Sequence, residues 1–124
     1  MIANDCASPS RQLHSTFSEM KNELIGRWRI ESMELWDQKF VDLVTEGNFT
    51  FEEDDYGHFA FGAVRGELLY EIEQNEEKVH FSWEGLDERD QRSGRGWVQI
   101  KDKKMKGKFY FHNGDDSGFA AHKK

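Results

Sequence analysis

The sequence predicts a mainly β protein, an antiparallel up-and-down β-barrel of about eight strands with a short N-terminal α-helix. Three observations support this prediction. From residue 28 onward, aromatic and branched residues alternate with polar ones in short runs, which is typical of strands with one buried face. The turn signals between these runs are too short for parallel crossovers. Before residue 28, apolar residues recur at helical spacing and end at a glycine.

A short amphipathic helix is expected before the first strand. Thr16-Phe17-Ser18-Glu19 has the pattern of a capping box, in which side chains satisfy free backbone N–H groups at the helix start. Phe17, Met20 and Leu24 follow one helical face. Gly26 suits the position just past a helix end, because glycine enters the left-handed region without a Cβ penalty.

We expect strands that are joined mainly by hairpins. They cover residues 28–36, 48–53, 58–64, 67–74, 78–84, 96–101, 105–112 and 118–122. A closed barrel is favoured over a sandwich because closure removes exposed strand edges. The residues that alternation assigns to the inward face are aromatic or aliphatic: Leu68, Tyr70, Ile72, Val79, Phe81, Trp83, Phe109 and Phe111.

Composition and charge limit the classes of protein. The chain has 124 residues, enough for one core, so we expect one barrel domain at 16–124 after a flexible tail at 1–15. A net charge of −7 argues against general binding of nucleic acid or anionic membranes. A lone cysteine, Cys6, excludes an intrachain disulfide, and no run resembles a signal peptide or a membrane span. A cytoplasmic location is therefore expected.

The segment Gly26-Arg27-Trp28, which leads from the expected helix into the first strand, resembles the calycin superfamily, which includes the lipocalins. In lipocalins and their relatives the tryptophan packs across one end of an eight-stranded barrel, and many members hold a small apolar ligand inside. A helix-capping glycine followed by a core tryptophan explains the same residues without a ligand. The resemblance implies a lipocalin-like barrel and leaves an internal ligand open.

Three later motifs resemble those of a family of small uncharacterised bacterial proteins. These motifs are Trp83-Glu84-Gly85, Gly94-Arg95-Gly96-Trp97 and Gly114-Asp115-Asp116-Ser117. The resemblance implies a bacterial cytosolic origin and supplies no activity.

The function expected first is non-enzymatic binding, either of a small apolar or aromatic ligand in the barrel or of a protein partner at its rim. The residues predicted to contact a ligand are aromatic, with one arginine: Trp36, Tyr70, Phe81, Trp83, Trp97 and Arg95. The apolar segment 36–44 fits three interpretations, which stay open here. It forms a lid over a barrel mouth, an exposed patch for a partner, or a helical turn that closes the core.

A small enzyme is the alternative, because paired carboxylates serve acid and base chemistry. The candidate carboxylates are Glu84, Asp87 and Asp90 in a predicted long loop at 84–96, and Asp115 and Asp116 in a turn. Arginines interleave with the acids of the loop, so a salt-bridge network is the simpler explanation for them. Asn113-Gly114 is a strong hairpin signal, so turn formation explains the second pair.

No metal or cofactor is expected, because the histidines lack zinc-site spacing and His80 and His112 fall on outward faces. A homodimer is the third possibility. In that arrangement exposed aromatic residues such as Phe59, Phe61 and Tyr110 pair across a two-fold axis.

Overall fold

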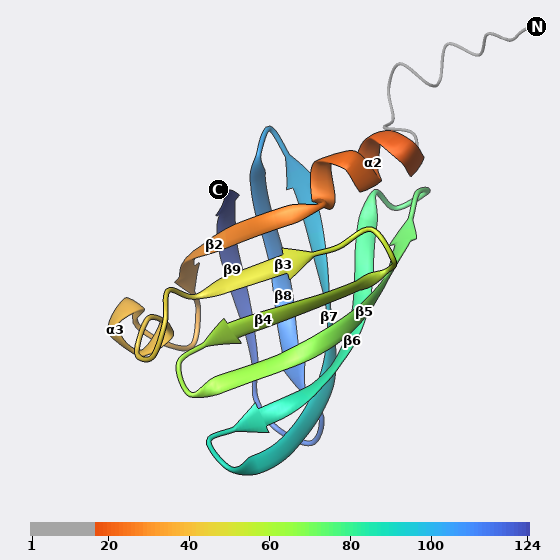
Figure 1. Cartoon of the computed structure of the whole chain (residues 1–124). Coiled ribbons are helices and arrows are strands. Elements are labelled where there is room, and N and C mark those ends of the chain that lie inside the picture. The colour runs from red at the N-terminus through yellow and green to blue at the C-terminus, as the bar shows by residue number, and fades with distance from the viewer. Residues whose placement is uncertain (1–16) are drawn as a thin grey trace, which may run out of the picture.

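A computed structural model describes residues 17–124, which form one closed, antiparallel, eight-stranded barrel (Figure 1). Helix α2 (Phe17–Leu24) precedes the first strand, and the short helix α3 (Gln38–Val41) follows it. The strands are β2 (Gly26–Met33), β3 (Asn48–Phe51), β4 (Tyr56–Phe61), β5 (Val64–Glu73), β6 (Lys78–Asp87), β7 (Asp90–Lys101), β8 (Lys104–Phe111) and β9 (Asp116–Lys123). The predicted tail at 1–15 and Thr16 of the capping box lie outside the described residues.

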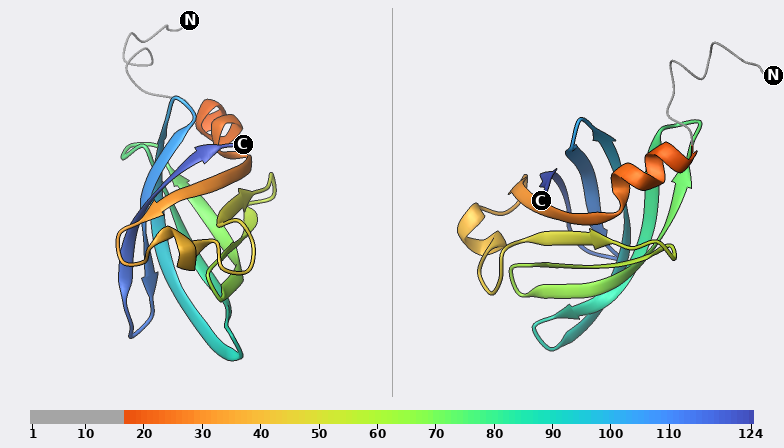
Figure 2. Two further views of the ribbon diagram at one scale, coloured as in Figure 1. Left: turned by 90° about the vertical axis from the view of Figure 1, so that its left-hand side faces the viewer. Right: turned by 45° about the horizontal axis from the view of Figure 1, so that its top comes forward.

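Each strand pairs with its neighbour in sequence, and the first strand closes the barrel on the last. Trp28 of β2 lies opposite Phe49 of β3 on one side and opposite Lys123 of β9 on the other. The up-and-down order predicted from the sequence is therefore confirmed. Helix α2 lies across the end of the barrel opposite α3 (Figure 2). It buries Met20 and Leu24, as its helical spacing predicts.

Lys123 joins the last strand to the helix and to the first strand. Its ammonium group donates hydrogen bonds of 2.6 Å to the carbonyl oxygens of both Glu23 and Ile25, at the end of α2. It also lies 5.0 Å from the centre of the Trp28 ring, which is fully buried. Burial lowers the pKa of this lysine. The Lys123 side chain thus links the last strand, β9, to the first strand, β2, and to the end of α2.

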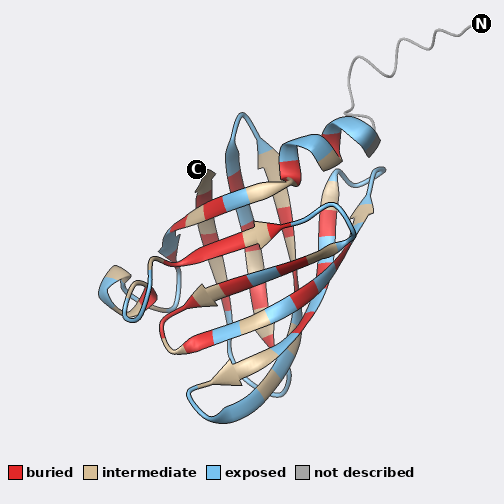
Figure 3. Cartoon of the chain, viewed as in Figure 1, coloured by how far each residue is buried: buried red, intermediate tan, exposed pale blue. Residues whose placement is uncertain are grey.

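The inward faces of the strands carry an aromatic core. Buried and exposed residues alternate along the strands (Figure 3), and the side chains predicted to point inward are all buried or packed against the core. Phe109 is fully buried among other rings. Its ring centroid lies 4.8–6.2 Å from those of Phe49, Phe59, Phe61, Phe81, Trp83 and Phe111. Such distances are those of stacked and edge-to-face ring pairs.

The expectation that Phe59 and Phe61 are exposed is wrong. They are 2% and 0% exposed, because alternation along β4 turns both phenylalanine rings into the barrel. Ala60 between them and His58 before them lie on the outward face. Tyr110, named with them, does lie on the outward face and is half-buried.

The prediction of a long loop at 84–96 is also wrong. Strand β6 continues to Asp87 and β7 begins at Asp90, and these two residues pair directly across the hairpin. Only residues 88 and 89 form the turn, where Glu88 has a φ of 59°. The sequence hides these strand ends because glycine occupies inward positions there, so apolar and polar residues do not alternate.

Glycine at an inward position makes room for the rings. Gly96 lies opposite Phe81 on β6 and opposite Phe109 on β8. A Cβ atom on Gly96 would lie 2.3 Å from Cζ of Phe81 and 2.6 Å from the carbonyl oxygen of Lys108. Neither the packed ring nor the strand backbone can move away without cost.

We expect Gly96→Ala to lower the free energy of unfolding by about 1–3 kcal/mol, because the added methyl group overpacks the core. Gly118→Ala is the matched control, since its new Cβ would have no neighbour closer than 3.4 Å. Urea unfolding followed by tryptophan fluorescence measures both variants. A Gly96→Ala protein as stable as Gly118→Ala would contradict this account of the core.

Candidate functional site

The segment around α3 covers one mouth of the barrel. The ring centroid of Trp36 lies 5.8 Å from that of Phe40. It also lies 5.5 Å from Phe61 and 6.1 Å from Phe111, which belong to the core. Val41 of α3 is fully buried. The segment therefore closes the core at this end, in agreement with the interpretation of residues 36–44 as a helical turn that closes the core.

The same connection carries an exposed apolar patch, which we call the α3 rim. The α3 rim consists of Leu35, Leu43 and Val44, which are 49%, 62% and 73% exposed. Among the residues that the structure describes, Leu69 is the other large apolar side chain with such exposure. The patch interpretation of this segment therefore also fits the structure.

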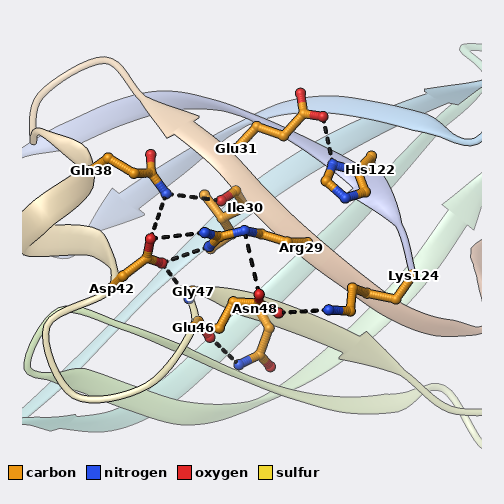
Figure 4. A network of polar contacts seen from close by, with 10 residues as sticks. All are labelled: Arg29, Ile30, Glu31, Gln38, Asp42, Glu46, Gly47, Asn48, His122 and Lys124. Carbon is orange, nitrogen blue, oxygen red and sulfur yellow. Dashed lines mark hydrogen bonds and ion pairs between the residues drawn. The ribbon is translucent and has the colours of Figure 1, made fainter.

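A polar network fastens the connection to β2 (Figure 4). Asp42 accepts hydrogen bonds from both terminal nitrogens of Arg29, at 2.6 and 2.8 Å. It also accepts from Nε2 of Gln38 at 3.0 Å and from the Gly47 N–H at 2.9 Å. Gln38 donates as well to the carbonyl oxygen of Ile30, at 3.2 Å. The hydrogen bonds from the Arg29 guanidinium hold the pKa of Asp42 well below its usual range.

We expect Asp42→Asn to lower the free energy of unfolding by about 1 kcal/mol at neutral pH, because the bidentate pair with Arg29 is lost while solvent screens part of its strength. The folded-state pKa is depressed, so this stabilisation is present above the unfolded pKa of about 3.9 and is lost as the pH falls through the folded value. Denaturant unfolding at neutral pH and at about pH 3 should therefore show a smaller difference at the lower pH. Glu71→Gln, at an exposed position, serves as control, and a difference that grows with acid would contradict the assignment.

The structure separates the residues predicted to bind a ligand. Those that point into the packed interior are Tyr70, Phe81 and Trp83. Trp36 belongs to the cover over the mouth. Trp97 and Arg95 lie on the outward face of β7. The Lys78 ammonium lies 4.5 Å from the centre of the Trp97 ring. The Arg95 guanidinium lies 4.2 Å from the Tyr110 ring.

A site that the sequence did not indicate lies on the outward faces of β4 to β8. Two adjoining hollows of about 770 and 1070 Å³ meet there, and we call them together the outer groove. The residues that line both hollows are Tyr56, Glu67, Glu84, Ser93 and His112. Of the predicted ligand-binding residues, Trp83 and Arg95 line the first hollow.

Strand register places the groove residues in two rows that cross the sheet. One row runs through His58, Glu67, Glu84, Ser93 and His112. The other runs through Tyr56, Leu69, Ser82, Arg95 and Tyr110. The first row puts two glutamates of different strands directly opposite each other at its centre.

Inward-facing glycines bring the strand backbones close together beneath the groove. A Cβ atom on Gly85 would lie 2.5 Å from Cα of its partner Gly66. A Cβ atom on Gly94 would lie 2.8 Å from Nε1 of Trp83, which donates a 3.0 Å hydrogen bond to the carbonyl oxygen of Tyr110. The indole of Trp83 therefore reaches the floor of the groove between the strands.

Several polar side chains in the groove have no protein partner. Across residues 17–124, no hydrogen bond or ion pair involves the side chains of Ser82, Glu84, Ser93 or His112. The Tyr56 hydroxyl hydrogen-bonds to Glu67, and this bond raises the pKa of Tyr56. The groove thus presents donors and acceptors to whatever occupies it.

The other candidate carboxylates lie elsewhere. Asp87 and Asp90 sit beside the β6–β7 turn, where Asp87 lies 3.9 Å from Arg92. Asp116 begins β9 and lies 3.4 Å from Lys108, and Asp115 precedes it in the β8–β9 turn. Within the described part of the chain, no three His, Cys, Asp or Glu side chains are grouped so as to hold a metal ion.

Comparisons with protein-family models, with curated proteins and with solved structures found no match. Neither helix of residues 17–124 is long and apolar enough to cross a membrane. The function of the chain is therefore inferred from its own geometry.

Proposed function

We propose that this chain is a calycin-like, non-enzymatic binding protein whose ligand binds in the outer groove and not inside the barrel. The observation that carries the proposal is the groove itself. It is a hollow on the outside of a barrel, lined by polar side chains such as Glu84 and His112 that have no partner among residues 17–124.

The calycin-like assignment is supported by the end of the barrel that α2 covers. Trp28, which follows Gly26-Arg27, is fully buried there. Its Nε1 donates a 2.8 Å hydrogen bond to the carbonyl oxygen of Leu24, the last residue of α2. A helix, a Gly-x-Trp segment and an up-and-down barrel thus follow one another as the resemblance implies.

The packed interior favours the groove over a ligand inside the barrel. An eight-stranded barrel is just wide enough for side chains to fill it, and here the rings around Phe109 occupy its centre. Trp36 and Phe40 cover the α3 mouth. An internal ligand has to displace rings whose burial stabilises the fold, and a ligand in the groove displaces only water.

A protein partner at the α3 rim is the second candidate. Leu35, Leu43 and Val44 favour it, because exposed apolar side chains on a loop that hydrogen bonds hold in place are typical of interaction surfaces. The experiment below separates the two candidates.

The test is a screen of small fragments with mixed polar and apolar groups, followed by amide shifts in two-dimensional NMR. We expect the shifted amides to cluster on the outward rows of β5 to β8, because a ligand there lies over their backbones. Fragments that shift only core or α3 rim amides would contradict the proposal. The variant Ser93→Tyr, at an exposed position, fills the groove and should abolish the shifts while thermal unfolding stays near that of the parent protein.

A further inference from the structure

We infer that the outer groove binds a small zwitterion with an apolar part, such as a free amino acid. Its ammonium group binds between Glu67 and Glu84, its carboxylate binds Arg95, and its apolar part lies on Leu69. This inference rests on the binding function proposed above and names the class of ligand for that site.

The ammonium position follows from the two glutamates. Glu67 and Glu84 are direct cross-strand partners, and like charges directly opposite each other destabilise a sheet. Among residues 17–124, no lysine or arginine forms an ion pair with either carboxylate. A cation held between them removes the repulsion and gains two charge-assisted hydrogen bonds.

The carboxylate position follows from Arg95. This arginine lines the same 770 Å³ hollow as both glutamates. Ser93 is the cross-strand partner of Glu84, so Arg95 lies two residues along β7 and is a diagonal neighbour of Glu84. Even so, the described chain shows no ion pair between Arg95 and Glu84, and the guanidinium lies over the Tyr110 ring instead. The hollow therefore holds a positive and a negative group that are not paired with each other.

The apolar contact follows from Leu69. This side chain is 63% exposed, although it stands in the middle of the sheet, and it lies between Tyr56 and Ser82 in its row. The small side chain of Ser82 leaves the space beside the leucine open. An aliphatic or aromatic group placed there covers an exposed apolar surface, which favours binding.

Three probes that share one apolar body test the charge pattern: L-phenylalanine, 2-phenylethylamine and 3-phenylpropionate. Titration calorimetry and amide shifts with the full chain give their affinities. We expect phenylalanine to bind at least about tenfold more tightly than either singly charged probe, because it alone satisfies both charged sites. Equal binding by phenylalanine and phenylethylamine overturns the inference.

Two variants assign the two charged sites. Glu84→Gln should weaken phenylalanine and phenylethylamine by about tenfold and leave phenylpropionate unchanged. Arg95→Gln should weaken phenylalanine and phenylpropionate and leave phenylethylamine unchanged. Glu71→Gln, an exposed glutamate on the same outward face of β5 but outside the groove, is the matched control and should bind like the parent protein.

The outcomes separate this inference from the proposed function. If neutral fragments shift the groove amides but the three probes bind alike, the binding function stands and the zwitterion is wrong. If no probe or fragment shifts the groove amides up to about 10 mM, where even weak sites fill, both are wrong. Thermal unfolding of each variant shows whether a loss of binding reflects a loss of fold.

Discussion

Aromatic packing inside a narrow barrel is the constraint on which the rest of this structure depends. The rings around Phe109 fill the interior, and glycines such as Gly96 give them the space they need. Because side chains fill the core without a ligand, the barrel can be closed at one mouth by the α3 segment and at the other by α2. The side chains on the outward faces of the strands can then differ in charge and polarity without disturbing the fold.

Much of the fold could be predicted because apolar and polar residues alternate clearly on most strands. This alternation predicts that Tyr70, Phe81 and Phe109 point inward, and all three are buried. The prediction failed at 84–96, because glycines and the charged Arg92 occupy the inward row there, so the inward face carries no run of apolar side chains. Backbone hydrogen bonds to the neighbouring strands hold a strand of this kind in place. A single sequence does not show which strands pair, so it does not indicate such a strand.

The outer groove could not be predicted, because it depends on register between strands that are distant in the chain. Glu67 and Glu84 become neighbours only once β5 is paired with β6, and Arg95 joins them only through the pairing of β6 with β7. Trp83 and Arg95, which the sequence predicts as ligand contacts, do line the groove, but the small ligand expected from the sequence lies inside the barrel. Hollowing of an outer surface by glycine is likewise visible only in three dimensions.

The bond between Lys123 and the end of α2 also constrains how this protein is made. The ribosome delivers α2 and Trp28 early, but the strand that completes their surroundings arrives about ninety residues later. Until then one edge of β2 has no strand beside it and is open to wrong pairing. Closure of the β2–β9 seam joins distant residues and is the slow, final event that we expect in folding after synthesis.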